Sequence, residues 1–172
     1  VKKRKCVIPF LVVAFNRIKG LREAYEFVDR STIPLELVVL DMGSTWEPFI
    51  EYRDSLAAPV FKFPYGMGPR DLWVSGELSR LGSGDFFLSD GDIDYHEVPG
   101  DAAEKMIELS KRFPWFPKVG LALRINDLPL DYEGKRIREW AKGDWAVKWD
   151  EEVYVTGLDT TIAYYPRREN TF

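Results

Sequence analysis

The sequence predicts an α/β fold in one domain, with a mostly parallel sheet flanked by helices. Apolar runs of strand length alternate with segments whose apolar residues recur at helical spacing, which is typical of open α/β sheets. Polar clusters follow several of these runs, at the strand ends where such sheets bind ligands. With 172 residues, 45% of them hydrophobic, the chain can build one sizeable core, and we expect no second domain.

The first part of the chain predicts three strands and two helices. Its opening apolar run is almost continuous, as expected of a strand that is covered on both faces. Pro48 falls where a first helical turn tolerates proline. The predicted elements, in order, are a strand over 7–15, a helix over 21–28, a strand over 35–40, a helix over 45–56 and a short strand over 59–63.

The second part of the chain continues the alternation of predicted strands and helices, and the pattern then becomes irregular. A turn-rich stretch, 64–69, separates the two parts. Beyond Asp127 the pattern loosens into a Trp-rich stretch, which is followed by a period-two run. The predicted elements are a helix over 70–81, a strand over 86–89, a helix over 101–113, a strand over 119–125 and a last strand over 160–164.

The composition argues against several classes of protein. The net charge is -4 and the pI is about 5.2, so the overall field does not favour binding to nucleic acid. A single cysteine, Cys6, excludes an internal disulfide and is compatible with a reducing cytoplasm. No apolar stretch approaches the roughly 18 residues that span a bilayer. We therefore expect a cytoplasmic protein whose basic leader, residues 1–5, gives at most peripheral membrane contact.

The triplet Asp90-Gly91-Asp92 ends one of the predicted strands. Residues i and i+2 of an extended chain point the same way, so the two carboxylates can converge on one hard divalent cation. Such a cation suits a diphosphate, whose charge it neutralises when a leaving group departs. We expect Asp92 to ligate Mn²⁺ or Mg²⁺ directly, and Asp90 to hold a ribose or a metal-bound water as the second candidate ligand. An ordinary Asp-rich turn is the alternative, and Asp94 either supports the site or is a solvated turn residue.

Two arginines are candidates for binding a diphosphate. Arg17 follows the first predicted strand together with Asn16, and Arg70 begins the third predicted helix. A guanidinium forms paired hydrogen bonds with phosphate oxygens. Ion pairing at the surface is the alternative for both arginines.

A further cluster, 41–44, follows the second predicted strand. Asp41 is expected to accept hydrogen bonds from a nucleobase edge or a ribose, or instead to cap a helix N-terminus. Gly43 and Ser44 permit a tight strand-to-helix turn with exposed N–H groups. Together with Asn126 and Asp127 after the fifth predicted strand, the clusters are expected at one edge of the sheet.

Four stretches of the chain carry a resemblance to a known family. They are VVAFNR at 12–17, VVLDMGST at 38–45, FLSDGD at 87–92 and the segment 121–129. In this order they resemble the GT-A glycosyltransferases, especially the family 2-like nucleotide-sugar transferases, over most of residues 6–165. The resemblance implies a GT-A fold and metal-dependent, inverting transfer of a sugar from a nucleotide diphosphate to a carbohydrate or other hydroxyl acceptor. It also implies that 12–17 begins the nucleotide site, that Asp41 contacts the base, and that the Asp-x-Asp motif binds ribose and the metal-diphosphate.

Transfer to a hydroxyl needs a carboxylate that accepts its proton, and a loop aspartate near the metal site is the natural choice. Asp127 is the candidate base and Asp159 the second choice, although either could cap a turn. Trp140 or Trp145 is expected to stack on an acceptor sugar, because aromatic faces suit the C–H surface of pyranoses. Ordinary burial is the alternative for at least one of them. We interpret 126–172 as the acceptor-side segment with the last strand.

The sequence leaves two other functions open. One is a non-catalytic nucleotide-sugar or glycan-binding module that keeps the fold without an efficient acceptor site, because little sequence follows Tyr165. The other is a phosphatase like the haloacid dehalogenases, which also uses an aspartate pair after a strand. That pattern wants Thr or Val where Asp94 stands. An EF-hand loop starting at Asp90 is disfavoured, because Tyr95 and Asp101 occupy the positions of its Gly and Glu.

Overall fold

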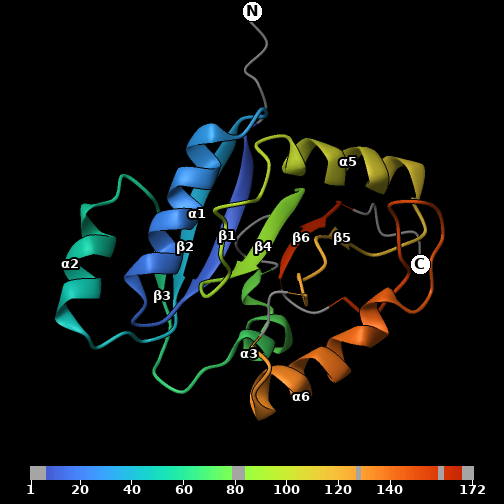
Figure 1. The fold of residues 1–172 in the computed structure, drawn as a ribbon. Helices are drawn as coiled ribbons and strands as arrows, with labels where there is room; N and C mark the ends of the chain where they lie inside the picture. The colour runs from blue at the N-terminus through green and yellow to red at the C-terminus, as the bar shows by residue number, and fades with distance from the viewer. Residues whose placement is uncertain (1–6, 79–83, 127–128, 159–160, 168–172) are drawn as a thin grey trace, which may run out of the picture.

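The computed structural model describes residues 7–78, 84–126, 129–158 and 161–167. Its central feature is a six-stranded sheet with the strand order β3-β2-β1-β4-β6-β5 (Figure 1). The strands are β1 (Ile8–Ala14), β2 (Leu35–Asp41), β3 (Val60–Lys62), β4 (Phe86–Asp90), β5 (Val119–Gly120) and β6 (Ile162–Tyr165). The fold class is therefore α/β, as the sequence predicts.

The sheet is mixed, and five of its six described strands run in the same direction, so the mostly parallel sheet that the sequence predicts contains one reversed strand. β1 pairs in parallel with both β2 and β4, and β2 pairs in parallel with β3. β6 runs antiparallel to both β4 and β5. The predicted last strand does join the same sheet, but in the reverse direction, and it begins at Ile162.

Helices cover both faces of the sheet. The helical elements are α1 (Ile18–Arg30), α2 (Glu47–Ser55), α3 (Pro69–Val74), α5 (Ala102–Arg112), α6 (Tyr132–Ala141) and the short 3-10 helix η1 (Lys142–Trp145). Alternate residues of β1 point to opposite faces. Phe10 and Val12 pack in one apolar cluster with α1, α2 and α5, whereas Leu11 and Val13 pack in the other with Leu72 of α3.

The order of the strands creates a switch point beside β1. From β1 the chain proceeds to β2 and β3 on one side, and it then returns to form β4 on the other side of β1. Ligands of open α/β sheets bind outside the carboxyl ends of the strands at such a point. The carboxyl ends of β1 and β4 are in register there, with Val13 opposite Asp90.

Two predicted elements are shorter than expected, for identifiable reasons. The expected strand 119–125 ends at Gly120; the Leu121 N–H still donates to Ile162, but the Leu121 carbonyl accepts a hydrogen bond from the Thr161 hydroxyl at 2.6 Å. The expected helix 70–81 is interrupted after Val74, where Gly76 adopts a φ of 74° that a helix cannot contain, and Glu77 and Leu78 are helical again. Part of that predicted helix, 79–81, lies outside the described residues.

The sequence analysis predicts no helix where α6 lies. This helix carries few apolar residues, and Ile137 and Trp140 on it are exposed. Its N-terminus does have a recognisable signal, because the Asp131 carboxylate accepts a hydrogen bond from the Gly134 N–H at 2.7 Å. Among the described residues, no helix has the length and apolar character that a membrane crossing requires.

Candidate functional site

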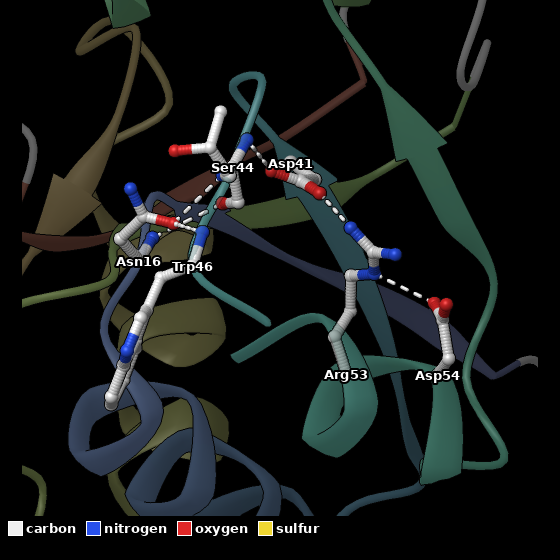
Figure 2. A network of polar contacts seen from close by, with 7 residues as sticks. Asn16, Asp41, Ser44, Trp46, Arg53 and Asp54 are labelled. Atoms are coloured by element: carbon white, nitrogen blue, oxygen red, sulfur yellow. Dashed lines mark hydrogen bonds and ion pairs between the residues drawn. The ribbon is translucent and has the colours of Figure 1, made fainter. Parts of the chain in front are cut away.

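Asn16 organises the turn that follows β1. It adopts a φ of 51°, a left-handed conformation that Asn tolerates better than most residues. Its side-chain Oδ1 accepts hydrogen bonds from the N–H groups of Thr45 at 3.0 Å and Trp46 at 2.9 Å. Its own N–H donates to the Ser44 hydroxyl at 3.1 Å (Figure 2). Asn16 therefore fixes the loop after β1 against the loop after β2. Two of the polar clusters that are expected at one edge of the sheet are thus in contact.

Asp41 is buried and occupied on both of its oxygens. Its Oδ1 accepts a hydrogen bond from the Ser44 N–H at 2.9 Å, and its Oδ2 pairs with the Arg53 guanidinium. The Asp41 and Arg53 side chains are only 2% and 3% exposed. Arg53 Nε also donates to Asp54 at 2.7 Å, and this hydrogen bond lowers the pKa of Asp54 below its ordinary value (Figure 2). Asp41 thus ties the 41–44 turn to α2, and its predicted contact with a base stays a prediction.

The alternative prediction, that Asp41 caps a helix N-terminus, is wrong. The residue closes a turn through Ser44, whereas α2 begins at Glu47, with Trp46 in the N-cap position. Pro48 lies in the first turn of α2, as predicted.

Gly43 is needed for the path of the chain. Its φ is 81°, and a Cβ at this position would lie 2.5 Å from the Tyr65 backbone nitrogen. The close approach brings Tyr65 beside the end of β1, where its ring centroid lies 5.9 Å from that of Phe15. Both rings are exposed, Phe15 by 42% and Tyr65 by 77%. No sequence pattern predicts this aromatic pair, in which Phe15 directly follows β1 and Tyr65 lies in a turn.

The Asp90-Gly91-Asp92 turn is pressed between β1 and α1. A Cβ on Gly91 would lie 2.5 Å from the Val13 carbonyl oxygen, and a Cβ on Gly20 would lie 2.0 Å from the Gly91 carbonyl oxygen. Glycine at both positions allows the turn to approach the start of α1. Asp92 there pairs with Arg17, with 2.8 Å between Nη1 and Oδ2. The two predicted clusters are therefore in direct contact.

A hollow of about 340 Å³ lies between the start of α1 and the 91–94 turn. Trp46 lines it from the α2 side and is 48% exposed. Lys19 also lines it and lies 3.4 Å from Glu23 and 3.6 Å from Asp94. The His96 backbone N–H and, to a smaller degree, the Lys19 ammonium lower the pKa of Asp94. Asp94 thus supports the turn as an ionised carboxylate.

Thr161 joins three segments at the same edge of the sheet. Its carbonyl accepts a hydrogen bond from the Asp90 N–H at 3.3 Å, and its hydroxyl donates to the Leu121 carbonyl at 2.6 Å. The residue is 7% exposed. Thr161, two positions after Asp159, therefore contacts Asp90 directly, and Leu121, six positions before Asp127, is joined to Asp90 through Thr161. Asp127 and Asp159 themselves lie outside the described residues.

The remaining predicted site residues that the structure describes take no part in the contacts given above for the Asp90-Gly91-Asp92 turn. Arg70 is exposed on α3, which covers the sheet face opposite α1, and Asn126 is exposed after β5. Trp140 is 62% exposed on α6. Trp145 is 39% exposed and packs edge-on against Tyr154, with 5.0 Å between ring centroids. Neither tryptophan is buried, so the alternative of ordinary burial is wrong for both of them.

The carboxylates of the Asp90-Gly91-Asp92 turn are the type of ligand that suits a hard cation which takes its remaining ligands from water or a substrate. Within the part of the chain that the structure describes, no three or more His, Cys, Asp or Glu side chains gather closely enough to hold a metal ion. Mg²⁺ is commonly bound by one or two carboxylates, with water and substrate phosphates completing its shell. Asp90 and Asp92 supply that number of carboxylates, and Arg17 beside Asp92 supplies a cation for an anionic ligand.

The site therefore combines the Asp92 carboxylate, a guanidinium, exposed aromatic rings and closely packed backbone at the carboxyl ends of β1, β2 and β4. Such a set can hold a metal-bound anionic ligand that also carries a planar ring. In comparisons with models of protein families and with curated proteins, the chain matches none of them.

Proposed function

We propose that the chain is a metal-dependent glycosyltransferase of the GT-A type, which moves a sugar from a nucleotide diphosphate to a hydroxyl acceptor. The ion pair between Arg17 and Asp92 is the observation that carries the proposal. It joins the N-cap residue of α1 to the turn after β4 at the switch point of the sheet, where α/β proteins bind their ligands.

The donor binds along the carboxyl edge of the sheet in this proposal. Asp90 and Asp92 hold Mn²⁺ or Mg²⁺, and the bound ion neutralises the charge on the diphosphate as it leaves. Arg17, with Arg70 as a second cation, pairs with phosphate oxygens. The exposed Phe15 and Tyr65 rings offer a face to the nucleobase, beside the 41–44 turn.

The transfer itself is a displacement at the anomeric carbon. The acceptor oxygen forms the new C–O bond, the C–O bond to the diphosphate breaks, and a carboxylate takes the proton of the acceptor hydroxyl. Asp127 is the proposed base and Asp159 the second choice. The contacts of Thr161 with Leu121 and Asp90 support a base from either segment. Attack from the face opposite the diphosphate inverts the anomeric configuration.

The acceptor class follows from the exposed tryptophans of the last third of the chain. Trp140 and Trp145 present ring surface on α6 and η1. Such surface suits the C–H face of a pyranose, so we propose a carbohydrate acceptor.

A thermal-shift panel tests the donor site. UDP, GDP, CDP and their sugar conjugates are each added with and without Mn²⁺, because a ligand that binds the native state raises the apparent stability. The proposal expects a shift with one nucleotide that depends on the metal, and release of the nucleotide diphosphate when acceptor sugars are supplied.

A matched pair of variants sharpens this test. Asp92→Asn should abolish the metal-dependent part of the shift. Asp101→Asn makes the same change of charge in a carboxylate that pairs with Lys105 at 2.9 Å, and it should leave the shift intact. Equal shifts in wild type and Asp92→Asn would sink the metal role. No shift with any nucleotide would sink the donor site as a whole.

A nucleotide-sugar-binding module without transfer is the second candidate. The guanidinium of Arg17 already pairs with Asp92 and competes with a metal ion for this carboxylate, which favours binding without metal-dependent transfer. This candidate predicts nucleotide-dependent shifts without turnover of any sugar conjugate.

A further inference from the structure

A buried tyrosine lies beneath the Asp90-Gly91-Asp92 turn. Tyr95 has no exposed surface, and its ring packs against Phe10 and Phe27 with centroids 6.2 and 5.8 Å away. Its hydroxyl donates to the Ser89 hydroxyl at 2.6 Å. Ser89 is also fully buried, and its hydroxyl donates to the Asp90 carbonyl at 3.2 Å. The tyrosine therefore ends a chain of hydrogen bonds that reaches the backbone of Asp90.

The peptide groups of Asp90 are held from both sides. The Asp90 N–H donates to the Thr161 carbonyl at 3.3 Å, and the Asp90 carbonyl accepts from the Ser89 hydroxyl; the Tyr95 hydroxyl, whose proton goes to Ser89, lies 3.4 Å from the same carbonyl. A phenylalanine ring would fill the same space between Phe10 and Phe27. The hydroxyl of Tyr95 is thus not required for packing, and its partners are the residue before the turn and the first residue of the turn.

The loop that carries Tyr95 is anchored independently. The Tyr95 N–H donates to the Glu23 carboxylate at 3.3 Å, and its carbonyl accepts from the Arg30 guanidinium. Both partners belong to α1, so the backbone of Tyr95 is fixed to that helix. Through its side chain the residue transmits this fixed position to the end of β4.

We propose that Tyr95 is a positioning residue, which sets the orientation of the Asp90-Gly91-Asp92 turn and thereby of the two carboxylates that hold the metal-bound nucleotide. The second half of this statement rests on the proposed function. The first half is a property of the fold, so the two can be tested separately.

Hydrogen exchange tests the first half without any ligand. Tyr95→Phe removes only the hydroxyl, and Ser89→Ala breaks the same chain from its other member. Tyr164→Phe is the matched control, because Tyr164 is 3% exposed and its hydroxyl donates to Asp85 at 2.7 Å near the other end of β4. The amides of residues 90–94 should exchange about tenfold faster in Tyr95→Phe and Ser89→Ala than in Tyr164→Phe. Equal protection in all three variants overturns the proposal.

Binding of Mn²⁺ together with the nucleotide that shifts the wild type tests the second half. Loss of a residue that orients metal ligands typically weakens metal binding tenfold or more. Tyr95→Phe should therefore bind Mn²⁺ and the nucleotide about tenfold more weakly than the wild type, and Tyr164→Phe should bind them like the wild type. Faster exchange with unchanged affinity confines the role of Tyr95 to the fold and overturns its role toward the ligand. If the wild type binds no nucleotide, the proposed function fails together with the ligand half, and hydrogen exchange still decides whether Tyr95 positions the turn.

Discussion

The Nη1 atom of Arg17 lies 2.8 Å from Oδ2 of Asp92, although the two residues are 75 positions apart in the sequence. Their side chains are 63% and 54% exposed, and exposed ion pairs add little to folding stability. The pair has a different consequence for binding. Asp92 can satisfy either the guanidinium or a metal ion, and Arg17 can satisfy either Asp92 or a phosphate oxygen. In the proposed function, a metal-bound diphosphate would satisfy both residues by replacing their mutual contact.

Removing Arg17 should therefore affect the metal and the nucleotide in opposite directions. In Arg17→Ala, we expect free Mn²⁺ to bind more tightly than in the wild type, because Asp92 no longer has a cationic partner. Nucleoside diphosphate should bind roughly 10- to 100-fold more weakly, since a hydrogen bond to a charged group contributes about 1.5 to 3 kcal/mol. Isothermal titration with each ligand measures both effects. Arg22→Ala is the control, because Arg22 lies on the same helix over the Tyr52 ring. Parallel changes for metal and nucleotide would contradict the competition.

The ion pair between Asp41 and Arg53 should matter for stability instead. Asp41→Asn leaves a buried guanidinium without its buried counter-charge, which costs about 3 kcal/mol in the free energy of unfolding. Asp54→Asn removes the other partner of Arg53, whose carboxylate is 51% exposed, and it should cost much less. Urea denaturation of the two variants measures the difference. Equal losses would show that the burial of Asp41 does not decide its contribution.

The arrangement of the main strands could be predicted because each strand has a local signal. The apolar runs that become β1, β2 and β4 are recognisable without knowledge of their neighbours. The direction of β6 could not be predicted in this way. Its residues show the same alternation in either direction, and pairing with β4 and β5 alone decides that it is antiparallel. Helix α6 has mainly polar residues, and only its Asp131 cap could have indicated it.

Those residues of the candidate site that have a local signal in the sequence could be predicted, and the others could not. Asn16, Arg17 and Asp92 lie at strand ends, which the sequence marks by a change from apolar to polar residues. Tyr95 and Thr161 act through partners far away in the sequence or through a buried hydroxyl, so no local pattern reveals them. The burial of Asp41 depends likewise on Arg53, which lies one helix later.

Asp150 gives the free energy of unfolding a dependence on pH. The N–H groups of Glu152 and Val153, and then the Arg112 guanidinium at 2.8 Å, lower the pKa of Asp150 in the folded protein. A lowered pKa contributes stability that is present above the unfolded value, about 3.9, and is lost as the pH falls through the folded value. Asp150→Asn should therefore lower Tm at pH 7, and this difference should shrink as the pH falls below about 4 and vanish below the folded pKa, where the wild-type carboxyl is protonated in both states. A difference in Tm that persists undiminished at pH 2 would contradict this cause.

Gly91 should be irreplaceable because backbone atoms occupy the space that a side chain would need. A Cβ at this position would lie 2.5 Å from the Val13 carbonyl oxygen and 3.2 Å from the Ala14 Cα, and neither atom can move without shifting β1. Gly91→Ala should lower the free energy of unfolding by about 1 to 3 kcal/mol, as overpacking does. It should also weaken metal-dependent nucleotide binding, because the turn must move away from β1 and α1.

Gly143→Ala is the matched control for this change. A Cβ at Gly143, in η1, would meet no atom within 4 Å. Its free energy of unfolding should therefore stay equal to that of the wild type or rise slightly, because alanine reduces the conformational freedom of the unfolded chain. Urea denaturation measures both variants, and the thermal shift with nucleotide and Mn²⁺ reports on the turn. If Gly91→Ala unfolds and binds like Gly143→Ala, close packing against β1 does not hold the two carboxylates in place.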